Sequence, residues 1–115
     1  MSYKLIKNEE IIKKEKFGVS LGIYPDIDNC GIVLESTEEG HNQEFYNNKS
    51  TFIYIILEGN GSFFLDGKEV VVSQGDMLSI SPNTKIYFKG KLKMILITSP
   101  KWNQVNEVET KDKVW

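Results

Sequence analysis

The chain has 115 residues, of which 40% are hydrophobic and 26% are charged, and its formal net charge is −2. This length and balance predict one globular domain with a modest core and exclude a disordered chain. The slightly acidic balance provides no basic surface for nucleic acid or anionic lipid. We therefore expect neither a nucleic-acid partner nor a membrane partner.

The N-terminal sequence contains no export or membrane signal. Residues 1–16 are rich in Lys and Glu and lack the apolar stretch of a signal peptide. The longest apolar run, residues 52–57, is far shorter than the ~20 residues of a membrane-spanning helix. We therefore expect a cytoplasmic protein.

Cys30 is the only cysteine of the chain, which excludes an internal disulfide framework and a thiolate cluster for a metal. A cysteine nucleophile needs a histidine partner, and the only histidine is His41. Cys30 lies in a turn that leads into an apolar run, and we interpret it as a small half-buried hydrophobic residue.

In chain order, the first expected element is a short helix within residues 8–16, where Ile11 and Ile12 would cover one end of a barrel. After residue 16, short apolar runs alternate with turn residues, which is typical of strands. The expected strands cover residues 17–23, 31–34, 52–57, 62–65, 69–72, 77–80, 86–88 and 92–98.

The turn signals between these runs indicate antiparallel pairing. Asp66 and Gly67 form a strong two-residue hairpin signal, and residues 58–61, with two glycines, are expected to form another turn. The run at 52–57 is β-branched and aromatic, which predicts a strand buried on both faces. Even strand spacing without a long helical pattern predicts an all-β fold, a small antiparallel β-barrel or jelly roll with at most a short N-terminal helix.

The expected domain organisation is a single barrel domain over residues 1–115. Residues 1–16 form an N-terminal arm, residues 17–99 the barrel and residues 100–115 a C-terminal tail.

The stretch from Gly40 to Gly90 resembles the two sequence motifs of the cupin superfamily, whose fold is a jelly-roll barrel. Gly40 and Gly59 stand at the ends of the first motif, and Gly75 begins the second. Pro82 lies one place beyond the proline of that second motif. The resemblance implies the cupin barrel and, by the habit of that family, a homodimer.

The resemblance also implies a metal site of three His and one Glu, but this sequence departs from it. At those four positions stand Tyr46, Asn48, Phe52 and Ile86. Transition metals prefer imidazole, thiolate or carboxylate donors, and this set offers none. We therefore expect a cupin without its usual metal and without another cofactor.

In the family the metal-ligand positions face the barrel interior, so the resemblance together with alternation implies which residues line the interior and bind a ligand. They are Tyr46, Asn48, Phe52, Tyr54, Ile86 and Phe88. Aromatic and aliphatic surface with two hydroxyls and one amide suits a small, partly apolar or ring-shaped ligand, such as a sugar-like molecule. The alternative is a barrel that these side chains simply fill.

His41 lies in a polar stretch beside Gly40, and we interpret it as a solvated loop residue. A displaced metal site on His41, Glu44 and Glu39 is the alternative, although strand residues three apart point to opposite faces. No catalytic residue follows from the sequence.

Three functions remain open. The first is a metal-free cupin-type barrel that binds a small molecule. The second is a metal-independent isomerase or epimerase of a sugar or sugar nucleotide, with tyrosine and His41 as acid and base. The third is a dimeric interaction module whose edge strands or tail, including Trp102, dock a partner. Whether the protein is an enzyme stays undecided at this point.

Overall fold

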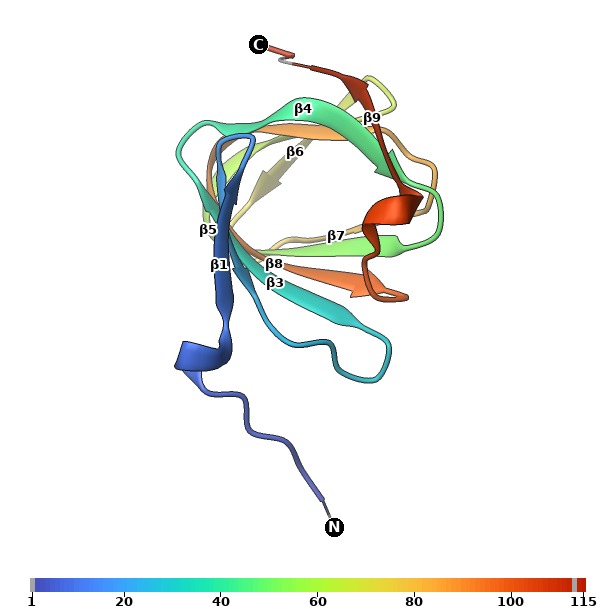
Figure 1. The fold of residues 1–115 in the computed structure, drawn as a ribbon. Coiled ribbons are helices and arrows are strands. Elements are labelled where there is room, and N and C mark those ends of the chain that lie inside the picture. Colours follow the sequence, from blue (N-terminus) through green and yellow to red (C-terminus); the bar gives the residue numbers. More distant parts are fainter. Residues whose placement is uncertain (1, 113) are drawn as a thin grey trace.

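The computed structural model describes residues 2–112 and 114–115. These residues form nine strands and two single-turn 3-10 helices, which run in the order η1 (Asn8–Glu10), β1 (Ile12–Lys16), β2 (Val19–Ile23), β3 (Gly31–Thr37), β4 (Gly40–Asn47), β5 (Thr51–Leu65), β6 (Lys68–Ser73), β7 (Met77–Ile80), β8 (Ile86–Ser99), η2 (Gln104–Asn106) and β9 (Glu107–Lys111). The expected all-β antiparallel barrel is confirmed (Figure 1). No helix among the described residues is long and apolar enough to cross a membrane.

β8 is the strand that joins the walls of the barrel. The part before Gly90 pairs with β4, the part after it pairs with β3, and β5 pairs along nearly its whole length. Gly90 has a φ of 126°, and a Cβ at this position would lie 2.7 Å from the Asn60 carbonyl oxygen, so only glycine fits. Because one strand serves both neighbours, β3 and β4 form opposite walls of a curled sheet (Figure 1).

The expected turn at residues 58–61 is wrong, because these residues lie inside β5. Gly59 and Gly61 pack so closely on β8 that a Cβ on either would collide with a carbonyl oxygen of that strand. The register of β5 against β8 shifts between Ile56 and Glu58. The two glycines therefore permit close strand contact and a bend rather than a reversal of the chain.

Both ends of the chain belong to the sheet, which corrects the expected arm and tail. In place of a helix over residues 8–16, η1 is a single turn, and β1 pairs with β2. Phe17 and Gly18 adopt positive φ values of 49° and 89° and form the tight turn of that hairpin. At the other end, β9 pairs with β4. The two terminal strands are therefore edge strands of the sheet, and most of their residues are exposed.

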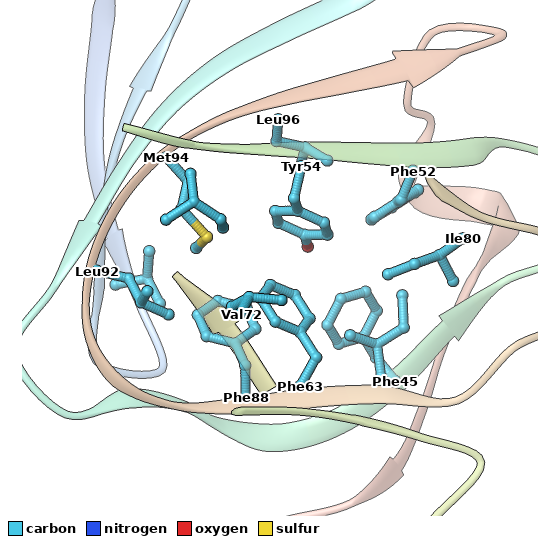
Figure 2. Packing of buried hydrophobic residues seen from close by; sticks show 13 residues of the cluster. Phe45, Phe52, Tyr54, Phe63, Val72, Ile80, Phe88, Leu92, Met94 and Leu96 are labelled. Atoms are coloured by element: carbon cyan, nitrogen blue, oxygen red, sulfur yellow. The ribbon is translucent and has the colours of Figure 1, made fainter. Parts of the chain in front are cut away.

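The core fills much of the barrel with aromatic and aliphatic side chains (Figure 2). Its buried hydrophobic members are Val19, Phe45, Phe52, Tyr54, Ile56, Phe63, Val72, Ile80, Ile86, Phe88, Leu92, Met94 and Leu96. The rings of Phe63 and Phe88 stack at 4.8 Å. The expected burial of residues 52–57 on both faces is wrong, because the alternate positions Ile53, Ile55 and Leu57 are only half-buried.

Phe63→Ala is expected to lower the free energy of unfolding by about 3–5 kcal/mol, because Phe63 is fully buried and its loss leaves a cavity. Val71→Ala is the control, since Val71 is 73% exposed on the neighbouring strand and should cost no more than about 0.5 kcal/mol. Urea denaturation measures both values. Equal effects of the two substitutions would contradict the assigned core.

Candidate active site

An ion pair joins the two ends of the chain. Lys16, the last residue of β1, places its Nζ 3.0 Å from Oε2 of Glu107, the first residue of β9. The other carboxylate oxygen of Glu107 accepts a hydrogen bond of 2.8 Å from the Trp102 indole. The Lys16 ammonium also lies 5.8 Å and 5.5 Å from the ring centroids of Phe17 and Trp102. These contacts fix one positive charge where the end of β1 meets the start of β9.

His41 lies on β4, and only 9% of it is exposed. The centroid of its ring lies 5.3 Å from that of Phe17, 5.0 Å from that of Phe45 and 5.6 Å from that of Phe88. Its Nδ1 is 2.8 Å from the Gln43 carbonyl oxygen, which can only accept a hydrogen bond. Nδ1 therefore carries the proton, and Nε2 keeps its lone pair. Burial lowers the pKa of His41 to about 4, so the ring is a neutral base at pH 7.

The interpretation of His41 as a solvated loop residue is wrong. The polar sequence around it is the strand β4, and six of the eight residues from Gly40 to Asn47 are buried. Gln43 accounts for part of that polarity, and its amide nitrogen donates to the carboxylates of Glu109 and Asp112. A polar strand that is covered by a second polar strand has no apolar alternation to reveal it.

Glu35 is a second buried titratable group, on β3, and only 6% of it is exposed. Burial raises the pKa of its carboxyl to about 8; the Lys16 charge opposes this shift and the Glu107 charge adds to it. Glu35 is therefore mostly protonated at pH 7. The sequence does not reveal Glu35, because the expected strand ends at Leu34, whereas β3 continues to Thr37. Its signal was the alternation that places it on the same face as Val33 and Thr37.

Tyr54 stands in the middle of the barrel interior, and its hydroxyl points away from β5 into the space between the walls (Figure 2). The centroid of its ring lies 4.8 Å from that of Phe63 and 5.9 Å from that of Phe88. Burial raises the pKa of the phenol well above its ordinary value, and the charges of Glu35 and Glu107 add to this. Tyr54 therefore remains a hydrogen-bond donor at pH 7.

The structure places four of the six expected ligand-binding residues inside the barrel. Phe52, Tyr54, Ile86 and Phe88 are buried in the core. Tyr46 is half-buried, and Asn48 is exposed beyond the end of β4, so its expected interior position is wrong. The neighbouring Phe45 and Asn47 are buried instead, since a shift of one residue exchanges the two faces of a strand.

The displaced metal site finds no donor set. The Glu44 carboxylate accepts a hydrogen bond of 2.8 Å from the Thr110 hydroxyl, and Glu39 is exposed. Within residues 2–112 and 114–115, no group of three or more His, Cys, Asp or Glu could hold a metal ion.

Together these residues form a site with two neutral proton carriers and one fixed cation. His41 can accept a proton at Nε2, Glu35 can donate one, and the phenol of Tyr54 can donate a hydrogen bond. The charge of Glu107 raises the pKa values of Glu35 and Tyr54. The charge of Lys16 lowers the pKa values of Glu35 and His41. Such a set can move protons on a bound ligand by general acid–base catalysis.

Comparison with solved structures gives both distant and near neighbours. KdgF from Halomonas sp. is 16% identical over 90% of this chain and 99% of that chain, with a TM-score of 0.75. Ectoine synthase from P. lautus is 12% identical over 98% of this chain and 94% of that chain, with a TM-score of 0.74. Pac13 from Streptomyces, a nucleoside dehydratase, is 32% identical over 98% of this chain and 94% of that chain, with a TM-score of 0.92. No family model and no curated protein matches the sequence.

The curled antiparallel barrel and its neighbours define a protein of the cupin class, as the sequence motifs indicated. Within that class, Pac13 is 32% identical to this chain, and the alignment covers nearly the whole of both chains. The chain belongs to the same cupin family as Streptomyces Pac13.

Three Pac13 variants seen with uridine carry a replacement of a histidine by glutamine or of one of two tyrosines by phenylalanine. The spacing of the three replaced residues along Pac13 equals the spacing of His41, Tyr54 and Phe88 in this chain. The histidine and the first tyrosine are therefore present here, and the second tyrosine is a phenylalanine. All three residues lie in one aromatic cluster, with Phe88 in contact with both others.

Glu35→Gln is expected to stabilise the protein at pH 7, on the order of 2 kcal/mol. Between the unfolded pKa of 4.5 and the folded pKa of about 8, the folded state holds a proton that the unfolded chain has released. The stability of the wild type therefore falls as the pH rises through this range, and the substitution removes that slope. Urea denaturation at several pH values measures it.

The window for that measurement is pH 6.5 to 8. Below pH 6.5, His41 acts in the opposite direction, because its lowered pKa makes stability fall as the pH drops towards about 4. The exposed Glu39→Gln is the control and should leave the slope unchanged. An unchanged slope in Glu35→Gln would contradict a protonated Glu35.

Proposed function

We propose that this protein binds a nucleoside at the polar side of the barrel interior and catalyses the loss of water from it. The observation that carries the proposal is His41, the only histidine of the chain. It is buried among aromatic rings with its Nε2 lone pair uncommitted, and it shares the spacing of the histidine replaced in Pac13.

The lining of the interior suits a nucleoside. The Phe17, Phe45 and Phe88 rings surround His41 and give this part of the interior the aromatic lining against which a base or a sugar ring would pack. Tyr54 and Glu35 offer hydrogen-bond donors, and Lys16 offers a cation. This combination of aromatic surface with a few polar groups is typical of small-molecule sites.

The chemistry follows from the protonation states. Loss of water removes a proton from one carbon and a hydroxyl from the next. An imidazole with a pKa near 4 is a weak base, so the C–H bond must be activated by an adjacent carbonyl group. In the proposed reaction His41 Nε2 takes this proton, and Lys16 stabilises the negative charge that develops on the carbonyl oxygen. The substrate class is therefore a nucleoside whose sugar carries a carbonyl group.

His41→Gln is expected to keep the affinity for uridine within about 3-fold and to lower turnover by at least about 100-fold, because it removes the base but not the binding surface. Calorimetry with uridine measures binding, and mass spectrometry after incubation with sugar-oxidised nucleosides measures the loss of one water.

The matched controls are Tyr54→Phe and Tyr46→Phe. Tyr54→Phe removes a hydroxyl from the interior and should weaken binding or turnover. Tyr46 on β4 is only half-buried, so its hydroxyl should be dispensable. Full turnover in His41→Gln, or equal effects of the two tyrosine substitutions, would contradict the proposed site.

A second candidate function is nucleoside binding without dehydration. Phe88 favours it, because this chain lacks the hydroxyl of the second tyrosine of Pac13. Pac13 with phenylalanine in that place still occurs with uridine, so Phe88 is compatible with binding.

Phe88→Tyr is expected to raise the affinity for uridine about 2- to 10-fold, the value of one hydrogen bond, if the added hydroxyl reaches the ligand. Phe63→Tyr is the control, since its ring stacks on Phe88 within the same core. Calorimetry measures both variants. Dehydration that occurs only in Phe88→Tyr supports the binding-only function of the wild type, whereas dehydration by the wild type refutes it.

A further inference from the structure

Glu35 has no structural role that explains its burial. It lies on β3 within the barrel, beside Met94 on β8 and Leu21 on β2 in the sheet register. Among the described residues, no group forms a hydrogen bond with its carboxyl. Two described side-chain atoms, Gln43 Oε1 and Asn47 Nδ2, have neither a hydrogen-bond partner nor contact with solvent. The carboxyl oxygens of Glu35 are not among these atoms. The carboxyl oxygens of Glu35 are therefore unpartnered but not sealed from solvent.

A buried carboxyl without a partner destabilises a fold, and an apolar residue would pack better at this position. Structural carboxylates in this chain show the contrast: Glu107 and Glu44 each have hydrogen-bond donors on their oxygens. Glu35 is thus an unpartnered polar side chain that faces into the site already described.

Glu35 also stands across the barrel from the base. His41 lies on β4 and Glu35 on β3, and these strands are opposite walls of the barrel (Figure 1). A ligand held between these two walls could contact both side chains. Two groups on opposite walls can act on one molecule from its two sides.

We propose that Glu35 is the acid of this site: its carboxyl donates a hydrogen bond to a hydroxyl of the bound nucleoside and protonates that hydroxyl as it leaves. The protonation of the leaving hydroxyl rests on the proposed function. The hydrogen bond to the nucleoside does not depend on that reaction, because it also forms in a protein that only binds the nucleoside.

The step balances without a further reactant. His41 Nε2 takes the proton from the activated carbon, and the electron pair of that C–H bond forms the new double bond. The C–O bond of the neighbouring carbon breaks, and the oxygen leaves as water with the proton from Glu35. The proton on His41 then returns through solvent to the Glu35 carboxylate, which the Lys16 cation stabilises in the meantime.

The groups around Glu35 keep its carboxyl protonated until the reaction takes place. From β1 comes the cation of Lys16, from β9 the carboxylate of Glu107 and from β5 the phenol of Tyr54. The neighbours on β2 and β8 are the apolar Leu21 and Met94. Burial outweighs the attraction of Lys16, so the pKa of Glu35 stays raised.

The experiment compares Glu35→Gln and Glu35→Ala with the wild type. Glutamine keeps a hydrogen-bond donor but has no proton to transfer, so uridine affinity should stay within about 3-fold while turnover falls at least about 100-fold. Glu35→Ala should lower both the affinity for uridine and the turnover. Wild-type affinity should also fall as the pH rises past 8, and Glu35→Gln should remove this dependence. Infrared spectroscopy at pH 7 should show a protonated carboxyl band that Glu35→Gln abolishes.

The outcomes separate the two proposals. Wild-type turnover that survives in Glu35→Gln overturns the acid role while the proposed dehydration stands. If the wild type binds uridine but dehydrates no nucleoside, the dehydration and the proton transfer fall, and the pH dependence of binding decides whether Glu35 contacts the ligand. If uridine does not bind, the hydrogen bond from Glu35 to the nucleoside is overturned, and an absent carboxyl band overturns the protonation of Glu35 as well. A lower melting temperature in Glu35→Gln would indicate a structural residue and contradict the proposal.

Discussion

The antiparallel pairing of β5 with β8 is the constraint on which the rest of the structure depends. It runs from Thr51 opposite Ser99 to Leu65 opposite Ile86, so two long strands bend together. This shared bend allows β8 to meet β4 before Gly90 and β3 after it, and thereby closes the sheet into a barrel. Tyr54 and Phe88 come from these two strands, and their contact lies at the centre of the interior.

The site depends on a second closure, which the ends of the chain supply. Lys16 and Glu107 are 91 residues apart in sequence and meet because β1 pairs with β2 and β9 pairs with β4. The ion pair is half-exposed on the lysine side, so its direct contribution to stability is small. Its larger effect is electrostatic, since it sets a cation and a carboxylate beside Glu35 and His41.

The barrel could be predicted from the sequence because its signals are local. Apolar alternation, the Asp66-Gly67 hairpin and the spaced glycines of the cupin motifs each follow from neighbouring residues. The site could be predicted only in part. Tyr54 and Phe88 lie on strands with clear alternation, whereas His41 lies on a strand whose buried positions are partly polar.

The remaining site residues could not be predicted because long-range pairing creates them. Lys16 and Glu107 stand in segments that read as a solvated arm and tail, and nothing near either residue indicates its partner. Asn48 was placed inside because the strand register was taken from the motif rather than from the true end of β4 at Asn47. An error of one residue suffices to exchange the faces of a strand.

Burial shifts the pKa values of Glu35 and His41 in opposite directions, so that at pH 7 both side chains are mainly neutral. The same desolvation that raises the pKa of Glu35 to about 8 lowers that of His41 to about 4. At every pH between these values the acid is protonated while the base is free. In water the order is reversed, because a carboxyl ionises below an imidazole. The barrel thus inverts the solution chemistry of one glutamate and one histidine, and it does so by burying both side chains within the same interior.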